Sequence, residues 1–138
     1  MSRFFDSKAI AEAVEMDNGE VLLVDRKALL FKVSENIYPT LLFDEFLKTL
    51  PTVIVDMGAV RHVCNGADIM APGIVRIEGE FDKSALVLVI DVQYGKKLAL
   101  GEAQIDSEAA KTVKKGVVVK NVHFVGDEIW NVIKELGT

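Results

Sequence analysis

The apolar positions of the first fifty residues recur at helical spacing and then in strand-like runs. Between residues 9 and 14 they stand three and four positions apart behind a polar cap, which predicts a short amphipathic helix over Ser2–Met16. Two apolar runs follow, at residues 20–24 and 28–33. The polar segment Asp25-Arg26-Lys27 separates these runs, so together they predict a β-hairpin.

A second helix is predicted after Tyr38-Pro39. Its apolar side chains keep to one face as far as Leu50, and Pro51 ends it because proline has no backbone N–H to donate. The pattern changes abruptly at this proline. We therefore expect a small α+β domain at residues 1–51, packed as a separate layer against a second domain at residues 52–138.

Beyond Pro51 the pattern consists mainly of short strands. They are predicted at residues 53–56, 67–70, 74–78, 86–92, 98–105 and 117–124. Helices are predicted over Gly58–Asn65, from Asp106 to Lys115, and after Asp127. Short strands at this spacing with a few small helices indicate a closed or nearly closed barrel, so the expected fold class is α+β with a mostly-β second domain.

The predicted helix Gly58–Asn65 has two distinct faces. Val60, Val63 and Cys64 share one face and are expected to meet the core. Arg61, His62 and Asn65 point elsewhere and are expected to be exposed. The helix therefore presents a partly basic surface to solvent.

Small residues surround the end of this helix. Gly66 stands where the helix should end, because glycine adopts the left-handed C′ conformation without a steric penalty. Ala67 to Met70 should then be extended, and Pro72-Gly73 closes the segment as a turn. A turn of small residues beside an exposed basic helix face suits close approach to a phosphodiester backbone.

Length and composition restrict the class of protein. A chain of 138 residues can form one ordinary domain or two small ones without a disulfide or metal staple. One cysteine cannot form an internal disulfide, and one cysteine with two histidines is too few for a structural zinc site. The sequence has neither a signal-peptide pattern nor an apolar run near the ~18 residues of a membrane span. We expect a cytoplasmic protein with no cofactor, no metal and no membrane segment.

The charge is acidic overall but basic in one place. The net charge of −5 argues against nucleic acid when it is taken alone. Residues 1–56 carry six basic and ten acidic side chains, whereas residues 57–138 carry ten and eleven. Residues 109–126 hold four lysines and no acidic residue. This local basic segment is the kind of electrostatic footprint that an RNA contact requires.

The segment from Gly58 to Gly73 also resembles a known family. Gly58-Ala59-Val60, then Asn65 to Met70, then Pro72-Gly73, resemble the signature of PUA domains, the RNA-binding modules of pseudouridine synthases and archaeosine transglycosylases. Four further motifs resemble, in order, the family of the multiple-copies-in-T-cell-lymphoma protein and its archaeal relatives: Tyr38-Pro39-Thr40-Leu41, Lys115-Gly116-Val117, Asn121 to Phe124 and Gly126 to Trp130. Position 71 departs from the pattern, since alanine stands where relatives can carry arginine or cysteine.

The resemblance implies a PUA pseudobarrel preceded by a small α+β pre-PUA domain. It also implies a noncatalytic protein that recognises structured RNA, tRNA or rRNA, such as a tRNA acceptor end, during translation. The small ribosomal subunit or a translation factor is implied as a further partner. Backbone amides around residues 66–73 and nearby lysines would hold phosphates. The candidate RNA-binding residues are Arg61, His62, Asn65, Gly66, Ala67, Asp68, Pro72, Gly73, Lys96, Lys97, Lys114, Lys115 and Lys120.

Each candidate also has a purely structural interpretation. Gly66, Pro72 and Gly73 are ordinary turn residues, and Asp68 can close a turn by accepting backbone hydrogen bonds. Lysines at helix ends and hairpin tips often serve only solubility. Cys64 is expected to be a small buried hydrophobe, and His123, inside an apolar strand, a structural residue.

Three functional hypotheses remain open. No P-loop, dinucleotide fingerprint, zinc-protease motif or nucleophile elbow occurs, so we do not expect an enzyme and name no catalytic residue. The leading hypothesis is RNA binding in translation. The second is an accessory subunit of a translation or RNA-modification complex whose acidic N-terminal domain docks a protein. The third is a fragment of an RNA-modifying enzyme, and the lack of any catalytic domain in the 138 residues argues against it.

Overall fold

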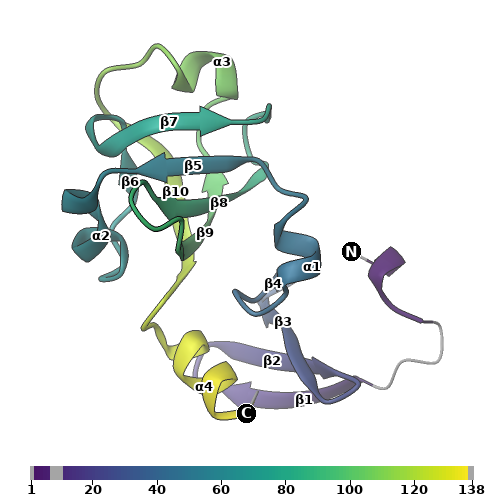
Figure 1. The fold of residues 1–138 in the computed structure, drawn as a ribbon. Coiled ribbons are helices and arrows are strands. Elements are labelled where there is room, and N and C mark those ends of the chain that lie inside the picture. Colours follow the sequence, from purple (N-terminus) through teal and green to yellow (C-terminus); the bar gives the residue numbers. More distant parts are fainter. Residues whose placement is uncertain (1, 7–10, 137–138) are drawn as a thin grey trace. The chain divides into compact units, whose positions relative to one another are not determined.

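The computed structural model describes residues 2–6 and 11–136, which form two compact units (Figure 1). The first unit combines residues 1–49 with residues 128–138, and the second unit consists of residues 50–127. Each of the two sheets pairs only strands of its own unit. The last helix therefore belongs with the beginning of the chain, whereas the sequence pattern had grouped it with the second domain.

The first unit is a four-stranded antiparallel sheet in the order β1-β2-β3-β4. Its elements are the 3-10 helix η1 (Ser2–Phe4), β1 (Ala11–Met16), β2 (Gly19–Val24), β3 (Lys27–Val33), β4 (Asn36–Pro39), α1 (Asp44–Leu47) and α4 (Glu128–Leu136). Helix α4 contacts β2 and β3, and its Ile133 is fully buried. Phe43 packs with the rings of Phe4 and Phe46 beside α1.

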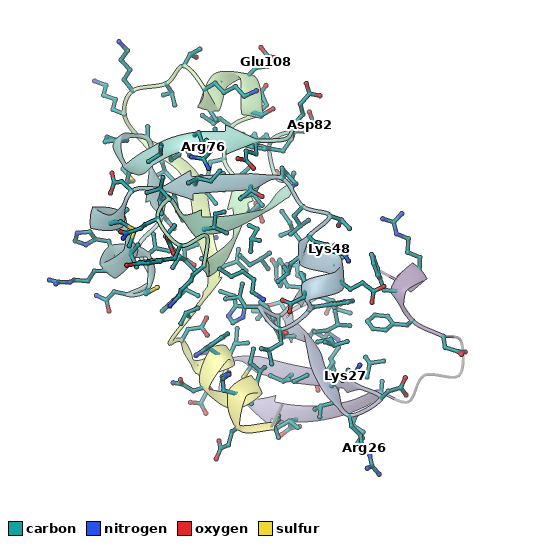
Figure 2. The ribbon with its side chains drawn as sticks, in the orientation of Figure 1. Arg26, Lys27, Lys48, Arg76, Asp82 and Glu108 are labelled. Atoms are coloured by element: carbon teal, nitrogen blue, oxygen red, sulfur yellow. The ribbon has the colours of Figure 1, made fainter. Side chains whose placement is uncertain are left out.

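The predicted hairpin of the first unit is confirmed. Strands β2 and β3 pair antiparallel with Val21 opposite Phe31, and both of these side chains are fully buried. Asp25 and Arg26, which begin the connection, both have positive φ angles, as a tight two-residue hairpin turn requires. Figure 2 labels Arg26 and Lys27 at this turn.

Two predictions of helices in the first unit are wrong: part of the first helix is a strand, and the second helix is shorter than predicted. Within the range predicted as a helix, Ala11–Met16 is a strand paired with β2, and residues 7–10 lie outside the described part. Pairing with the whole of β2 outweighs a weak helical period of small side chains. The second helix covers only Asp44–Leu47, because Tyr38 and Pro39 complete β4 against β3.

The second unit is a six-stranded sheet that curls into a half-barrel, in the order β6-β10-β9-β8-β5-β7 (Figure 1). Strands β5 and β8 are parallel, and the other neighbours are antiparallel. Its elements are β5 (Thr52–Val55), α2 (Met57–Val63), β6 (Ile69–Met70), the 3-10 helix η2 (Ala71–Gly73), β7 (Ile74–Glu78), β8 (Leu86–Asp91), β9 (Lys97–Ala103), α3 (Ser107–Ala110) and β10 (Val117–Phe124). Valines and alanines dominate its core.

Most predictions for the second unit are confirmed, and one helix is shorter than expected. Strands β7 and β10 have the predicted bounds. Helix α3 begins with Asp106 as its N-cap, as expected, but ends at Ala110. Lys114 and Lys115 therefore lie in the loop before β10 and not at a helix end. None of the helices formed by the described residues has the length and apolar character needed to cross a bilayer.

His123 is a structural residue, as the sequence predicted. Its side chain in β10 is fully buried, and its Nδ1 lies 2.9 Å from Oδ2 of Asp127. The same carboxylate oxygen accepts the backbone N–H of Phe124 at 2.9 Å. Asp127 thus holds the end of β10 in place just before the chain leaves the second unit.

Candidate functional site

Helix α2 is fixed at its start by Asp56 and along one side by the core. The Asp56 carboxylate accepts the backbone N–H of Ala59 at 2.9 Å, as an N-cap does. Val63 is buried, and Val60 and Cys64 pack partly buried against the same core cluster. The predicted core face of this helix is therefore confirmed. Arg61, His62 and Asn65 are exposed, also as predicted.

The end of α2 is a Schellman motif with Gly66 at the C′ position. Gly66 has φ +93°, its N–H donates to the Val63 carbonyl, and the N–H of Ala67 donates to the His62 carbonyl at 3.0 Å. A Cβ at residue 66 would also stand 3.3 Å from the ring of Phe124. Glycine here reverses the chain tightly enough for β6 to return beside α2.

Asn121 of β10 holds this reversal from the opposite side. Its side-chain amide donates to the carbonyls of Val63 and Ala67, both at 3.0 Å, and its backbone N–H donates to Oδ1 of Asp68 at 2.9 Å. The regular pairing of β10 with β9 is interrupted just after Asn121. The irregular strand thus presents one side chain to two carbonyls of the loop between α2 and β6.

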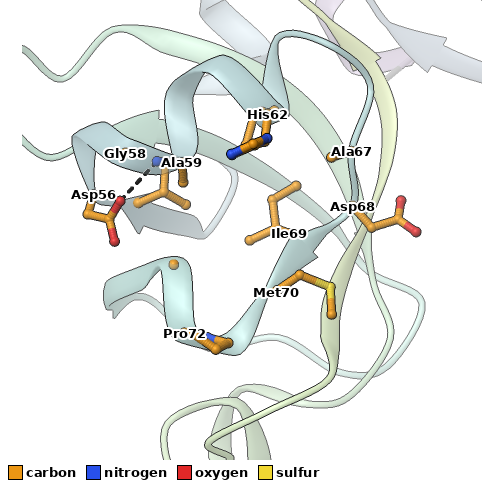
Figure 3. A pocket seen from close by; sticks show the side chains of 12 residues that line it. Asp56, Gly58, Ala59, His62, Ala67, Asp68, Ile69, Met70 and Pro72 are labelled. Carbon is orange, nitrogen blue, oxygen red and sulfur yellow. Dashed lines mark hydrogen bonds between the residues drawn. The ribbon is translucent and has the colours of Figure 1, made fainter.

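Helix α2, β6 and η2 enclose a cavity of about 450 Å³. The residues that line it are Val55, Asp56, Gly58, Ala59, His62, Val63, Ala67, Asp68, Ile69, Met70, Pro72 and Gly73. Figure 3 shows His62 on α2 and Ile69 on β6 pointing toward the same space from opposite sides, whereas the Asp68 side chain points away from it. Gly73 permits the close approach of η2, because a Cβ there would lie 3.3 Å from Cβ of Ala59.

The cavity wall is largely apolar, and no lysine or arginine lines it. Its ionisable groups are the His62 imidazole and the carboxylates of Asp56 and Asp68, each of which accepts a backbone N–H. A phosphate in this space would meet the Asp56 carboxylate and no lysine or arginine. A flat, mostly apolar group that can hydrogen-bond at its edge is better matched to such a wall.

The structure brings five of the candidate residues together at this cavity: His62, Ala67, Asp68, Pro72 and Gly73. Helix α2, the loop after it, β6 and η2 together form a corner of the second unit, residues 57–73. Arg61, Asn65 and Gly66 belong to this corner but do not line the cavity. The Ala71 N–H donates to the Gly116 carbonyl at 2.9 Å, so the loop that carries Lys114 and Lys115 joins the corner beside η2.

The remaining lysines lie at two other places on the sheet. Lys96 is exposed in the turn between β8 and β9, and Lys97, which is half-buried, begins β9. The N–H of Val92 in this turn donates to the Val55 carbonyl at 2.9 Å, which ties the turn to the strand that leads into the cavity. Lys120 is exposed on β10, opposite Glu102 of β9.

Some backbone amides expected to bind phosphate are already used within the fold. The N–H groups of Gly66, Ala67 and Ala71 donate to the carbonyls of Val63, His62 and Gly116 respectively. A donor engaged in this way cannot hold a phosphate without losing its internal bond. Phosphate binding at the corner must therefore depend mainly on side-chain cations.

The structure adds residues that the sequence reasoning missed. Asp56, Ala59, Ile69 and Met70 line the cavity, and Asn121 supports it. The position of Asp56 directly before the predicted helix was a usable N-cap signal. Asn121 stands 58 positions from Val63, and no local pattern could have paired the two.

The titratable residues near the corner give no sign of nucleophilic or metal chemistry. Burial raises the pKa of the Cys64 thiol, which keeps it protonated and poorly reactive. Within residues 2–6 and 11–136, no group of three or more His, Cys, Asp or Glu side chains is placed to hold a metal ion.

Comparison with known proteins identifies the second unit. The PUA domain family matches residues 51–125. A crystal structure of a PUA domain from Aeropyrum pernix K1, a tartrate complex, superposes with a TM-score of 0.83 at 32% identity, over 97% of this chain and 79% of that one. The expected fold class, a PUA fold preceded by a smaller N-terminal region, is confirmed.

The full-length relatives extend the match into the first unit. Protein MJ1432 of Methanocaldococcus jannaschii is 39% identical over 127 residues, which cover 90% of this chain and 77% of that protein. Translation machinery-associated protein 20 of Saccharomyces cerevisiae is 32% identical over 83% of this chain and 67% of its own length. Malignant T-cell-amplified sequence 1 of Rattus norvegicus is 32% identical over 81% of this chain and 64% of its own. The resemblance drawn from the sequence motifs is thereby confirmed.

Proposed function

Because this chain belongs to the PUA-domain family, we propose that it binds structured RNA in the context of translation, without catalysing a reaction on that RNA. The observation that carries the proposal is the cavity between α2, β6 and η2, which lies inside the segment that matches the family. Its volume and apolar wall suit an unpaired nucleobase. A tRNA acceptor end, which offers unpaired nucleotides at the end of a duplex, is the proposed ligand class.

The proposed mechanism separates the base from the phosphates. The base enters the cavity between His62 and Ile69, where its edge can exchange a hydrogen bond with the imidazole. The phosphates stay outside, within reach of the exposed cations Arg61, Lys96, Lys114, Lys115 and Lys120 and of the half-buried Lys97. Most selectivity then comes from RNA shape and from an unpaired end, as is common in RNA recognition.

A titration of a tRNA transcript at low salt tests the proposal. Ala67→Phe places a large side chain at the cavity wall and should weaken binding by about tenfold, comparable with the loss of one stacked base. Ala109→Phe makes the same change at an exposed alanine on α3 and serves as the matched control, with affinity unchanged. Equal binding by both variants would remove the cavity from the RNA site.

The choice of RNA is tested with the same protein. Removal of the unpaired nucleotides at the 3′ end of the transcript should weaken binding by the same factor as Ala67→Phe, and the two changes together should add little. If the end can be removed without effect, the ligand is another part of the tRNA or an rRNA.

An alternative function is docking of a protein partner by the first unit. The observation that favours it is the surplus of acidic over basic residues in this unit, eleven against seven. Absence of RNA binding by the unaltered protein even at low salt would favour this alternative, with a translation factor or the small ribosomal subunit as the partner.

A further inference from the structure

The turn between β8 and β9 combines an exposed aromatic ring with an unusually well fixed backbone. Tyr94 is 65% exposed, the largest exposed fraction among the large apolar and aromatic side chains of the described residues. Most tyrosines bury the ring and leave only the hydroxyl in water. In this turn, the ring itself is presented to solvent.

The buried side chain of Asp91 fixes the backbone of this turn. Its side chain is only 3% exposed, and its carboxylate accepts the backbone N–H groups of Tyr94, Gly95 and Lys96. Gly95 has φ +66°, and a Cβ there would meet nothing within 4 Å, so glycine is required by the backbone conformation and not by crowding. The position of the Tyr94 backbone is therefore set before any ligand arrives.

One face of the Tyr94 ring is close to a cation. Nζ of Lys96 lies 5.7 Å from the ring centroid, which is within the range of a cation–π contact. The Gln93 amide donates to the Tyr94 hydroxyl at 3.0 Å. These contacts restrain the ring, and the cation draws electron density from it. A restrained ring beside a lysine is suited to stacking with a nucleobase whose phosphate meets the ammonium group.

The turn is also a neighbour of the cavity within the second unit. The Val92 N–H donates to the carbonyl of Val55, which lines the cavity, and Asp91 stands opposite Val55 in the β5–β8 pairing. Figure 1 shows the connection between β8 and β9 beside α2. The turn that carries Tyr94 is therefore joined directly to the strand whose Val55 lines the cavity.

From this geometry we propose that Tyr94 is a stacking platform for a second unpaired base of the bound RNA, with Lys96 contacting the adjoining phosphate. This inference rests on the proposed function. It assigns to the turn a base contact that its lysines alone do not provide, because lysines bind phosphates without regard to pairing. The turn would thereby favour single-stranded over duplex RNA.

The experiment uses the full chain and the same tRNA transcript. Tyr94→Ala should weaken binding by about 5- to 150-fold, the effect of losing one base–aromatic stack, while leaving the salt dependence of the affinity unchanged. Tyr94→Phe keeps the ring and should bind within about twofold of the unaltered protein. Lys96→Ala should instead make the salt dependence shallower by about one phosphate contact.

Photocrosslinking supplies a second measurement. RNA that carries 5-iodouridine at its unpaired positions should crosslink to the tryptic peptide of residues 84–96, which contains Tyr94. RNA binding that survives Tyr94→Ala at full strength, or crosslinks confined to other peptides, would overturn this inference and leave the proposed function standing. Failure of the unaltered protein to bind any RNA would overturn both.

Discussion

The backbone amide of Asn121 donates a hydrogen bond of 2.9 Å to the Asp68 carboxylate, across 53 positions of sequence. Together with the two bonds from its side chain to Val63 and Ala67, it fixes the loop between α2 and β6 against β10. Oδ1 of Asn121 is buried and has no hydrogen-bond partner among the described residues. The side chain is oriented by its amide nitrogen alone, and the corner depends on those two donors.

Removal of these donors should destabilise the second unit. Asn121→Ala removes a donor from the carbonyls of Val63 and Ala67, of which the former keeps the Gly66 N–H, and should cost about 1–2 kcal/mol of unfolding free energy. Asn121→Asp should cost more, because it places a carboxylate oxygen against two carbonyl oxygens. Asn65→Ala, at an exposed asparagine of the same loop, is the control. Urea unfolding followed by far-UV circular dichroism measures all three, and a milder effect of Asn121→Asp than of Asn121→Ala would contradict the assigned orientation.

The two faces of α2 should respond very differently to substitution. Val63→Asp puts a carboxylate at a position that is only 3% exposed, at a cost of several kcal/mol, comparable with the roughly 5–15 kcal/mol stability of a whole domain. The second unit should therefore unfold. Arg61→Ala, on the exposed face, should leave the melting temperature nearly unchanged. Amide NMR spectra distinguish the outcomes, and greater damage from Arg61→Ala would reverse the assignment of the faces.

Stability in acid should depend on Asp91. The backbone N–H of Tyr94, followed by those of Lys96 and Gly95, outweighs desolvation and lowers the pKa of Asp91 below its ordinary value of 3.8. A lowered pKa in the folded state means that the ionised carboxylate stabilises the fold above pH 3.8, and that this contribution is lost as the pH falls through the folded pKa.

The prediction is a pH-dependent effect of Asp91→Asn. The urea midpoint of Asp91→Asn should be clearly lower than that of the unaltered protein at about pH 7, and the difference should shrink as the pH is lowered from 3.8 through the folded pKa. Asp82→Asn, at an exposed position on the same unit, is the control and should show little difference at either pH. A gap that is constant across this range would mean that the charge of Asp91 is not what stabilises the turn.

Lys114 and Lys115 should contribute to the salt dependence of RNA binding. If the protein makes only ~3–5 phosphate contacts, the logarithm of the affinity should fall with the logarithm of salt concentration at a slope of roughly −2 to −4. Replacement of Lys114 and Lys115 together by alanine should make this slope shallower by about one to two units. The melting temperature should hardly change, because exposed lysines contribute little to stability. An unchanged slope would exclude both lysines from the site.

The second unit could be predicted well because its local signals agree with its tertiary structure. Ile74–Glu78 and Val117–Phe124 are rich in β-branched residues and each follows a glycine, and each forms the strand predicted for it. The helix predicted over Ser2–Met16 is wrong at Ala11–Met16 for the opposite reason. Ala11 and Ala13 favour a helix locally, since alanine has the highest intrinsic helix propensity, but pairing with β2 overrode that preference and decided the conformation of the segment.

The candidate site was predictable as a corner but not as a cavity. The glycine at 66 and the Pro72-Gly73 turn mark the two reversals of the chain, and both are present as expected. The wall itself is completed by Ile69 and Met70 from β6, and it is held by an asparagine from a distant strand. Such relationships depend on strand pairing across the sheet, which a single sequence does not encode locally.

The division of the chain has a consequence for its synthesis on the ribosome. The second unit is an insertion between the two segments that build the first. All of its residues leave the ribosome before α4, whose Ile133 is fully buried in the first unit. The PUA unit can thus complete its fold while the four-stranded sheet still lacks its covering helix. Vectorial synthesis therefore makes the N-terminal segment the first to emerge and the last to mature, and nascent chains truncated after residue 127 should present a folded PUA unit joined to an exposed, unfinished sheet.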